Sequence, residues 1–161
     1  MGATGWARPA AHPPSGEAGP EELAIFVSGA PMSGMALNRE LVPLGARFLR
    51  SCLTAPSYKL CALAGGPPQR TGLSRQAQGS RAIAGGLWAL PLPAAGRFLA
   101  GIPAPLGLGS VALQDGSEEV GFIYEPIGVE SGTDVSEHGG WRGALEQLAA
   151  PRRMTVSAAS K

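Results

Sequence analysis

Residues 23–38 read LAIFVSGAPMSGMALN, a short apolar run that leads into a loop with two closely spaced glycines. Residues 23–27 have the length and the β-branched and aromatic content of a buried strand. Gly29 and Gly34 then bracket four residues where the backbone can turn with few side chains in the way. Such a loop can direct several backbone N–H groups at one point and so favour a carboxylate or phosphate. A plain connection between two elements would have the same spacing, and both interpretations stay open.

Length and composition indicate one domain that is rich in turns. The chain has 161 residues, of which 24 are glycine and 15 are proline, so we expect short strands and little helix. Only 16% of the residues are charged and the net charge is +1, which offers no electrostatic basis for binding nucleic acid or an anionic membrane. No apolar run reaches the roughly 18 residues of a membrane span. The first residues lack the apolar core of a secretory signal, so we expect a cytoplasmic location.

The two ends of the chain differ in composition from its middle. Residues 1–21 are mainly alanine, glycine and proline, which cannot bury enough apolar surface to fold, so we expect a disordered tail. Residues 150–161 are expected to form a second, flexible tail. The folded domain is therefore placed at residues 22–149. Within it, residues 65–79 read GGPPQRTGLSRQAQG and are expected to form a polar surface loop.

Two β-hairpins are predicted from alternating or β-rich runs on either side of a turn signal. In residues 111–124, apolar side chains alternate around an Asp-Gly turn. Residues 48–55 and 58–63 predict a second hairpin, in which Cys52 and Cys61 would lie opposite each other. Such cross-strand Cβ atoms are about 4.5–5.5 Å apart, slightly beyond the usual disulfide spacing. We therefore expect two reduced thiols.

Two short helices complete the expected fold. The first runs through Phe98 and Leu99 and is stopped by the prolines that follow. The second covers residues 141–148, where large apolar residues recur at i, i+4 and i+7. Gly85 and Gly86 lie inside an apparent strand, which indicates a bulge or a close approach by another group. The sum is an α+β domain, a small, mostly antiparallel mixed β-barrel with two short helices.

Side chains that could carry chemistry are few. Ser33 lacks the first glycine of a nucleophile elbow, and no phosphate-binding or dinucleotide fingerprint occurs, so no cofactor is expected. The two histidines, His12 and His138, do not predict a metal site. Glu125 ends an alternating strand and is either a general base or ligand anchor, or a solvated charge. His138 remains eligible because imidazole titrates near neutral pH. Tyr58 is either a core residue or a hydroxyl donor to a ligand.

Four stretches of the chain carry a family pattern. They are IFVSGAPMSGMALNREL, GARFLRSCLTAPSYKLCALAGG, LWALPLPAAGRFLAGIPAPLGLGSVALQDGSEEVGFIYEP and GGWRGAL. Together they resemble the C-terminal domain of allophanate hydrolase over residues 23–148, and the IPAPLGLG and GGW segments make the resemblance specific. It extends to the γ-glutamylcyclotransferase-like fold. That fold is a small mixed barrel whose first loop holds a carboxylate-bearing ligand by backbone N–H groups.

The resemblance implies a role in urea and allophanate nitrogen metabolism. In the full enzyme an amidase domain produces N-carboxycarbamate, and the C-terminal domain is thought to assist its decarboxylation to carbamate and carbon dioxide. The implied ligand is a small dicarboxylate. The residues expected to bind it are Gly29, Ala30, Met32, Ser33, Gly34, Asn38 and Tyr58. The candidate catalytic residues are Glu125 and His138.

Two departures from the family pattern bear on activity. The family usually has a histidine in the first loop, within Gly-Ala-His-Leu-Ser-Gly, and here that position is Pro31, which cannot transfer a proton and lacks an N–H. The amidase half is not in this sequence. We therefore interpret the chain as a stand-alone decarboxylase-like hydrolase domain impaired by Pro31. The alternative is a non-catalytic accessory or self-associating module for a separate amidase. Cyclotransfer is a third interpretation that rests on the fold resemblance alone, since Ser28 replaces the loop tyrosine and Glu130 matches the catalytic acid by position only.

Overall fold

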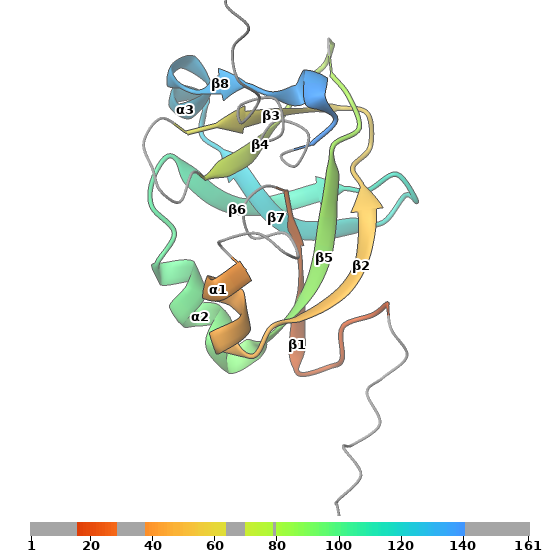
Figure 1. The fold of residues 1–161 in the computed structure, drawn as a ribbon, viewed down its shortest axis with the longest axis vertical. Helices are drawn as coiled ribbons and strands as arrows, with labels where there is room; N and C mark the ends of the chain where they lie inside the picture. The colour runs from red at the N-terminus through yellow and green to blue at the C-terminus, as the bar shows by residue number, and fades with distance from the viewer. Residues whose placement is uncertain (1–15, 29–37, 64–69, 79, 141–161) are drawn as a thin grey trace, which may run out of the picture.

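The computed structural model describes residues 16–28, 38–63, 70–78 and 80–140 of the chain (Figure 1). Within these residues, eight strands form one sheet. The strands are β1 Glu22–Val27, β2 Arg47–Leu53, β3 Tyr58–Ala62, β4 Thr71–Arg75, β5 Ala84–Pro91, β6 Leu106–Ala112, β7 Glu118–Tyr124 and β8 Thr133–Asp134. The helices are α1 Asn38–Leu41, α2 Leu92–Ala100 and α3 Pro126–Ser131, with 3-10 turns η1 Val42–Leu44 and η2 Ser136–His138.

The sheet is mixed, and β7 is the strand around which it is organised. The strand order is β2-β5-β1-β7-β4-β3-β8, and β6 pairs with β7 in addition. β1 and β4 both run parallel to β7, whereas the other pairs are antiparallel. Because β6 pairs with β7 along its whole length, β1 and β4 share the other edge of β7, one after the other.

The expected mixed, mostly antiparallel α+β fold with short helices is confirmed, but closure as a barrel is not. Among the described residues, β2 and β8 end the strand order and do not pair with each other. The architecture is consistent with the γ-glutamylcyclotransferase-like fold. Figure 1 shows α1 and α2 next to each other at one end of the molecule, while α3 and β8 lie at the other end.

The second half of β1 is buried on both faces by apolar groups. Ile25 and Val27 pack on one face with Trp88, Phe122 and the α1 residue Leu41. The intervening side chain, Phe26, points to the opposite face and joins the largest buried cluster. Burial on both faces explains why β1 reads as a continuous apolar run rather than an alternating one.

The structure corrects the expected hairpin of residues 48–63. β2 pairs with β5 and β3 pairs with β4, so the two segments are not hydrogen-bonded to each other as a hairpin. Cys52 lies opposite Gly85, and Cys61 lies opposite Gly72. Both cysteines are free, and burial raises the pKa of each thiol. Two β-rich runs separated by a short turn signal thus found different partners, because pairing is decided by burial across the whole sheet.

The expected polar loop at residues 65–79 is also wrong, because part of it forms β4. Thr71 and Leu73 are buried, and Leu73 lies opposite Ile123 of β7. Gly72 has no side chain because Leu106 and Tyr124 occupy that space, each with an atom 2.7 Å from where a Cβ would lie. A segment composed of small and polar residues can therefore form an interior strand when large side chains of neighbouring strands fill the space beside it.

Other expectations lie outside the described residues, including the helix at 141–148, most of the tail at 1–21 and the tail at 150–161. In the part of the chain that the structure describes, no helix is long and apolar enough to cross a membrane. The short helix through Phe98 and the hairpin around Asp115-Gly116 are confirmed as α2 and as β6–β7.

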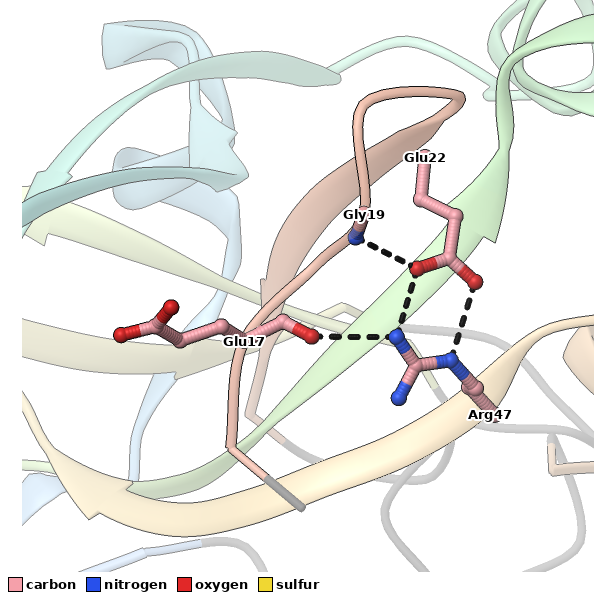
Figure 2. Close-up of polar contacts among 4 residues, drawn as sticks. All are labelled: Glu17, Gly19, Glu22 and Arg47. Carbon is pink, nitrogen blue, oxygen red and sulfur yellow. Dashed lines mark hydrogen bonds and ion pairs between the residues drawn. The ribbon is translucent and has the colours of Figure 1, made fainter. Parts of the chain in front are cut away.

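A bidentate ion pair fixes the start of β1 against β2 (Figure 2). Arg47 Nε donates to Glu22 Oε1 at 2.9 Å and Arg47 Nη2 donates to Oε2 at 2.6 Å. The Gly19 N–H also donates to Oε2, at 2.7 Å, and Arg47 Nη2 donates to the Glu17 carbonyl at 3.0 Å. The hydrogen bond from Arg47, and then that from Gly19, hold the pKa of Glu22 at about 2. This cluster ties residues 17–19 to the sheet.

The Glu22→Gln substitution should lower the free energy of unfolding at pH 7 by about 1 kcal/mol, since it removes a charge-assisted, bidentate pair at the surface. The folded-state pKa of Glu22 lies below its ordinary value of 4.5. The contribution is therefore complete above the ordinary pKa and is lost as the pH falls toward 2. Urea unfolding at pH 7 and near pH 2.5 measures it, with Glu21→Gln as control. An equal difference at both pH values would contradict the assignment.

Gly85 confirms the expected close approach inside β5. A Cβ there would overlap the Phe26 ring and lie 2.7 Å from the Val27 carbonyl oxygen. Gly85→Ala should therefore destabilise the protein by about 1–3 kcal/mol through overpacking. Gly96→Ala in α2 is the matched control, because a Cβ there meets nothing within 4 Å and should stabilise the helix by up to about 1 kcal/mol. Equal thermal midpoints for the two variants would refute the packing argument.

Candidate functional site

The end of β1 borders a cavity of about 210 Å³, which we call the β1 cavity. Its polar lining residues are Ser28, Glu40, Arg70, Thr71 and Arg97. Its apolar lining residues are Leu41, Leu44, Phe98, Ile102, Leu106 and Phe122, and Gly101 completes the set. Ser28, which directly precedes residues 29–37, and Glu40 of α1, which follows them, both line this cavity.

The apolar walls of the β1 cavity come from α2 on one side and from the sheet on the other. α2 begins directly after β5, with a proline in its first turn, where the missing N–H costs nothing. Phe98 packs edge-on against Phe122 of β7, with ring centroids 5.8 Å apart and planes at 80°. Leu41 of α1 is fully buried beside them. These walls keep water away from one side of any occupant.

Ser28 has an unusual place in the β1 cavity. This residue is only 2% exposed, and its Oγ has no hydrogen-bond partner among the described residues. Its carbonyl oxygen accepts a hydrogen bond of 2.7 Å from the Thr71 hydroxyl, which fixes the end of β1 beside the start of β4. An unpartnered buried hydroxyl costs about 1–3 kcal/mol relative to a paired one. A ligand that carries an acceptor or donor would recover that cost.

The charged side chains at the β1 cavity leave an excess of positive charge. Arg70 Nη2 lies 3.5 Å from Glu40 Oε1, and both side chains are partly exposed. The side chain of Arg97, on α2, makes no hydrogen bond or ion pair with any described residue. Two arginines against one glutamate attract an anion, and a guanidinium matches the geometry of a carboxylate.

Tyr58 and Glu125 are not brought to the β1 cavity. The Tyr58 hydroxyl accepts hydrogen bonds from Arg75 Nη2 at 2.8 Å and from the Ala112 N–H at 2.9 Å, and it lines a different hollow with Ser110. Glu125 is an exposed residue just before α3, where its N–H donates to the Pro105 carbonyl. The roles expected for both side chains stay predictions.

The remaining expected site residues fall where the structure gives no side-chain description. Asn38 begins α1, two residues before Glu40, and its backbone alone is described. The same holds for His138, at the end of η2. The loop residues Gly29, Ala30, Met32, Ser33 and Gly34 lie outside the described residues. Their expected part in ligand binding stays a prediction.

Sequence reasoning missed both arginines of the β1 cavity. Arg70 and Thr71 belong to the segment interpreted as a loop, although Thr71 and Leu73 alternate with the small residues Gly72 and Ser74, as in a strand. Arg97 lies in the predicted helix, beside Phe98, but nothing local shows which helix face meets β7. Among the described residues, no group of three or more His, Cys, Asp or Glu side chains is placed to hold a metal ion.

A mixed sheet whose first strand ends at a cavity with apolar walls, two arginines and one glutamate defines a small α+β domain with a candidate ligand site. Residues 23–146 match the family described as the allophanate hydrolase C-terminal domain, and the chain belongs to this family. It is 34% identical to urea amidolyase of Saccharomyces cerevisiae over 130 residues, which are 78% of this chain. The chain spans only 7% of the length of that relative.

Solved structures of similar proteins agree with the family. Allophanate hydrolase of Kluyveromyces lactis superposes with a TM-score of 0.74 at 32% identity, over 79% of this chain and 21% of that one. A uropathogenic E. coli-specific protein superposes with a TM-score of 0.71 at 29% identity, over 78% of this chain and 96% of that one. The fold of the described residues is thus that of the family.

The contact between Thr71 and Ser28 can be tested by removing one hydroxyl. Thr71→Val keeps the shape of the side chain but leaves the Ser28 carbonyl without its buried donor, so the free energy of unfolding should fall by about 1–2 kcal/mol. Thr133→Val, at an exposed threonine, is the control and should change stability little. Urea unfolding of both variants measures the difference. Equal stability of the two would show that this hydrogen bond does not hold β1 beside β4.

Proposed function

We propose that this domain binds a small carboxylate-bearing compound in the β1 cavity and promotes the decarboxylation of N-carboxycarbamate in allophanate breakdown. The observation that carries the proposal is the buried Ser28 hydroxyl, which has no partner among the described residues and lines a cavity whose described charges are net positive. Membership in the allophanate hydrolase C-terminal domain family supports the choice of substrate. Urea amidolyases, which the chain resembles, support a link to urea degradation.

The reaction requires three things of its site. As one carboxylate of N-carboxycarbamate leaves as carbon dioxide, the electrons of its C–N bond pass to nitrogen. That nitrogen then takes up a proton and carbamate is formed. A cationic group must hold the carboxylate that stays, and Arg97 is suited to this. The departing carboxylate is favoured by apolar surroundings such as Phe98 and Phe122. A proton donor must reach the nitrogen.

Proton supply is where this chain differs from its family. The family histidine of the first loop is replaced by Pro31, whose side chain has no titratable group that could donate a proton. We include in the proposal that decarboxylation is slowed for this reason, since a positioned acid typically contributes 10²–10⁴-fold, on the order of 3–5 kcal/mol. The candidates to take over this step are His138 and Glu125, or water.

A coupled assay tests the proposal. Allophanate is treated with an excess of a purified amidase domain, so that decarboxylation limits carbon dioxide release, and this protein is added. The wild-type chain should accelerate release, and Pro31→His should accelerate it by about tenfold or more beyond the wild type, because it restores a positioned acid. Pro56→His, at an exposed turn between β2 and β3, is the matched control and should behave as wild type.

Unchanged carbon dioxide release with both the wild type and Pro31→His would overturn the enzymatic proposal. The accessory interpretation would then be favoured if the chain also formed a stable complex with the amidase, measured by analytical ultracentrifugation of the mixture. Acceleration by Pro31→His alone would mean that the site is intact and that the lost acid is its single defect.

A further inference from the structure

We propose that the Glu40 carboxylate competes with ligand carboxylates for Arg70 in the β1 cavity. It thereby influences whether the cavity accepts a singly or a doubly charged ligand. A ligand with one carboxylate binds at Arg97 and leaves the pair between Glu40 and Arg70 intact. A ligand with two carboxylates must displace Glu40 from Arg70. The inference rests on the proposed carboxylate-binding function of the cavity and adds to it a residue that determines specificity.

The pair between Glu40 and Arg70 has the geometry of an exchangeable contact. The atoms Nη2 and Oε1 are 3.5 Å apart, which is long for a charge-assisted hydrogen bond. The Arg70 side chain is 31% exposed and the Glu40 side chain is 44% exposed. Solvated pairs of this kind contribute little to stability. A ligand carboxylate of better geometry can therefore replace Glu40 without disturbing the fold.

Arg97 differs from Arg70 in having no carboxylate of its own among the described residues. It precedes Phe98, whose ring is held against Phe122, so the backbone that carries the guanidinium is fixed relative to the cavity wall. The first carboxylate to arrive meets this arginine without having to break an existing pair. The two arginines are thus unequal, although both line the same cavity.

Glu40 also acts through its own charge. With Glu40 in place, the described lining has one positive charge in excess, which suits a monoanion. A second ligand carboxylate would lie near the Glu40 carboxylate, and like charges disfavour each other most strongly beside apolar walls. Without Glu40, both arginines would be open to a dianion. Glu40 therefore weakens the binding of dicarboxylates, the proposed substrate N-carboxycarbamate included, and has little effect on monocarboxylates such as the product carbamate.

Isothermal titration calorimetry at low salt, with malonate and with malonamate as ligands, tests the inference. Malonamate has nearly the shape of malonate but replaces one carboxylate by a neutral amide. Glu40→Gln should tighten malonate binding by about three- to tenfold, as expected for removing one competing charge from a partly exposed pair. It should change malonamate binding by less than about twofold. Arg97→Gln should weaken both ligands.

The matched control is Glu118→Gln. Glu118 also faces an arginine, Arg75, at 3.8 Å, and it lies outside the β1 cavity. This variant alters the net charge as Glu40→Gln does. Because the altered charge lies outside the cavity, both affinities should stay unchanged. If Glu40→Gln shifts malonate and malonamate equally, or shifts neither, while the wild type binds both, the specificity role of Glu40 is overturned and carboxylate binding stands. If neither wild type nor Glu40→Gln binds either compound saturably, the proposed function fails, and this inference with it.

Discussion

One edge of β7 has to serve two strands, and the rest of the molecule is arranged around that constraint. β1 lies beside the first part of this edge and β4 beside the later part, both parallel to β7. Where β1 ends, its Ser28 carbonyl accepts the Thr71 hydroxyl from β4. A strand that ends inside a sheet, rather than at its rim, leaves the space beyond it to be filled by other elements. Helices α1 and α2 line this space only in part, and the β1 cavity is what remains.

The cavity combines two environments that a decarboxylation site needs close together. Apolar side chains from α1, α2 and β7 supply a wall with few hydrogen-bonding groups, and the arginines supply charge at its border. Electrostatic interactions beside such a wall are stronger than in water, which would strengthen the influence of Arg97 and Glu40 on a ligand despite their exposure. In the proposed function, the replacement of the family histidine by Pro31 affects the proton-transfer step, whereas the arginines and apolar walls that would bind the ligand are present in this chain.

Local signals predicted the elements whose identity depends on neighbouring residues. The continuous apolar run gave β1, the prolines bounded α2, and the Asp-Gly pair marked the β6–β7 turn, where Gly116 has φ of 88°. What failed depended on distant partners. The run at residues 48–63 was assigned to one hairpin because its halves are adjacent in sequence, yet burial pairs them with β5 and β4. β4 itself was missed because its apolar surroundings come from Tyr124 and Leu106, which occupy the space beside Gly72 and are remote in sequence. The arginines of the cavity were missed because their neighbours in the cavity are likewise distant in sequence.

All of the described cavity lining comes from residues 28–122, which lie inside the 23–146 segment that matches the family. The segment that matches is only a small part of the yeast relatives, and the residues that line the cavity in this chain all lie within that segment. The uropathogenic E. coli-specific protein, 96% of which aligns with this chain, shows the same fold at nearly the size of the domain. The charge selection proposed for this cavity would therefore be a property of the domain itself. A partner that supplies substrate would determine which molecules arrive, whereas Arg70, Arg97 and Glu40 would determine which of them stay.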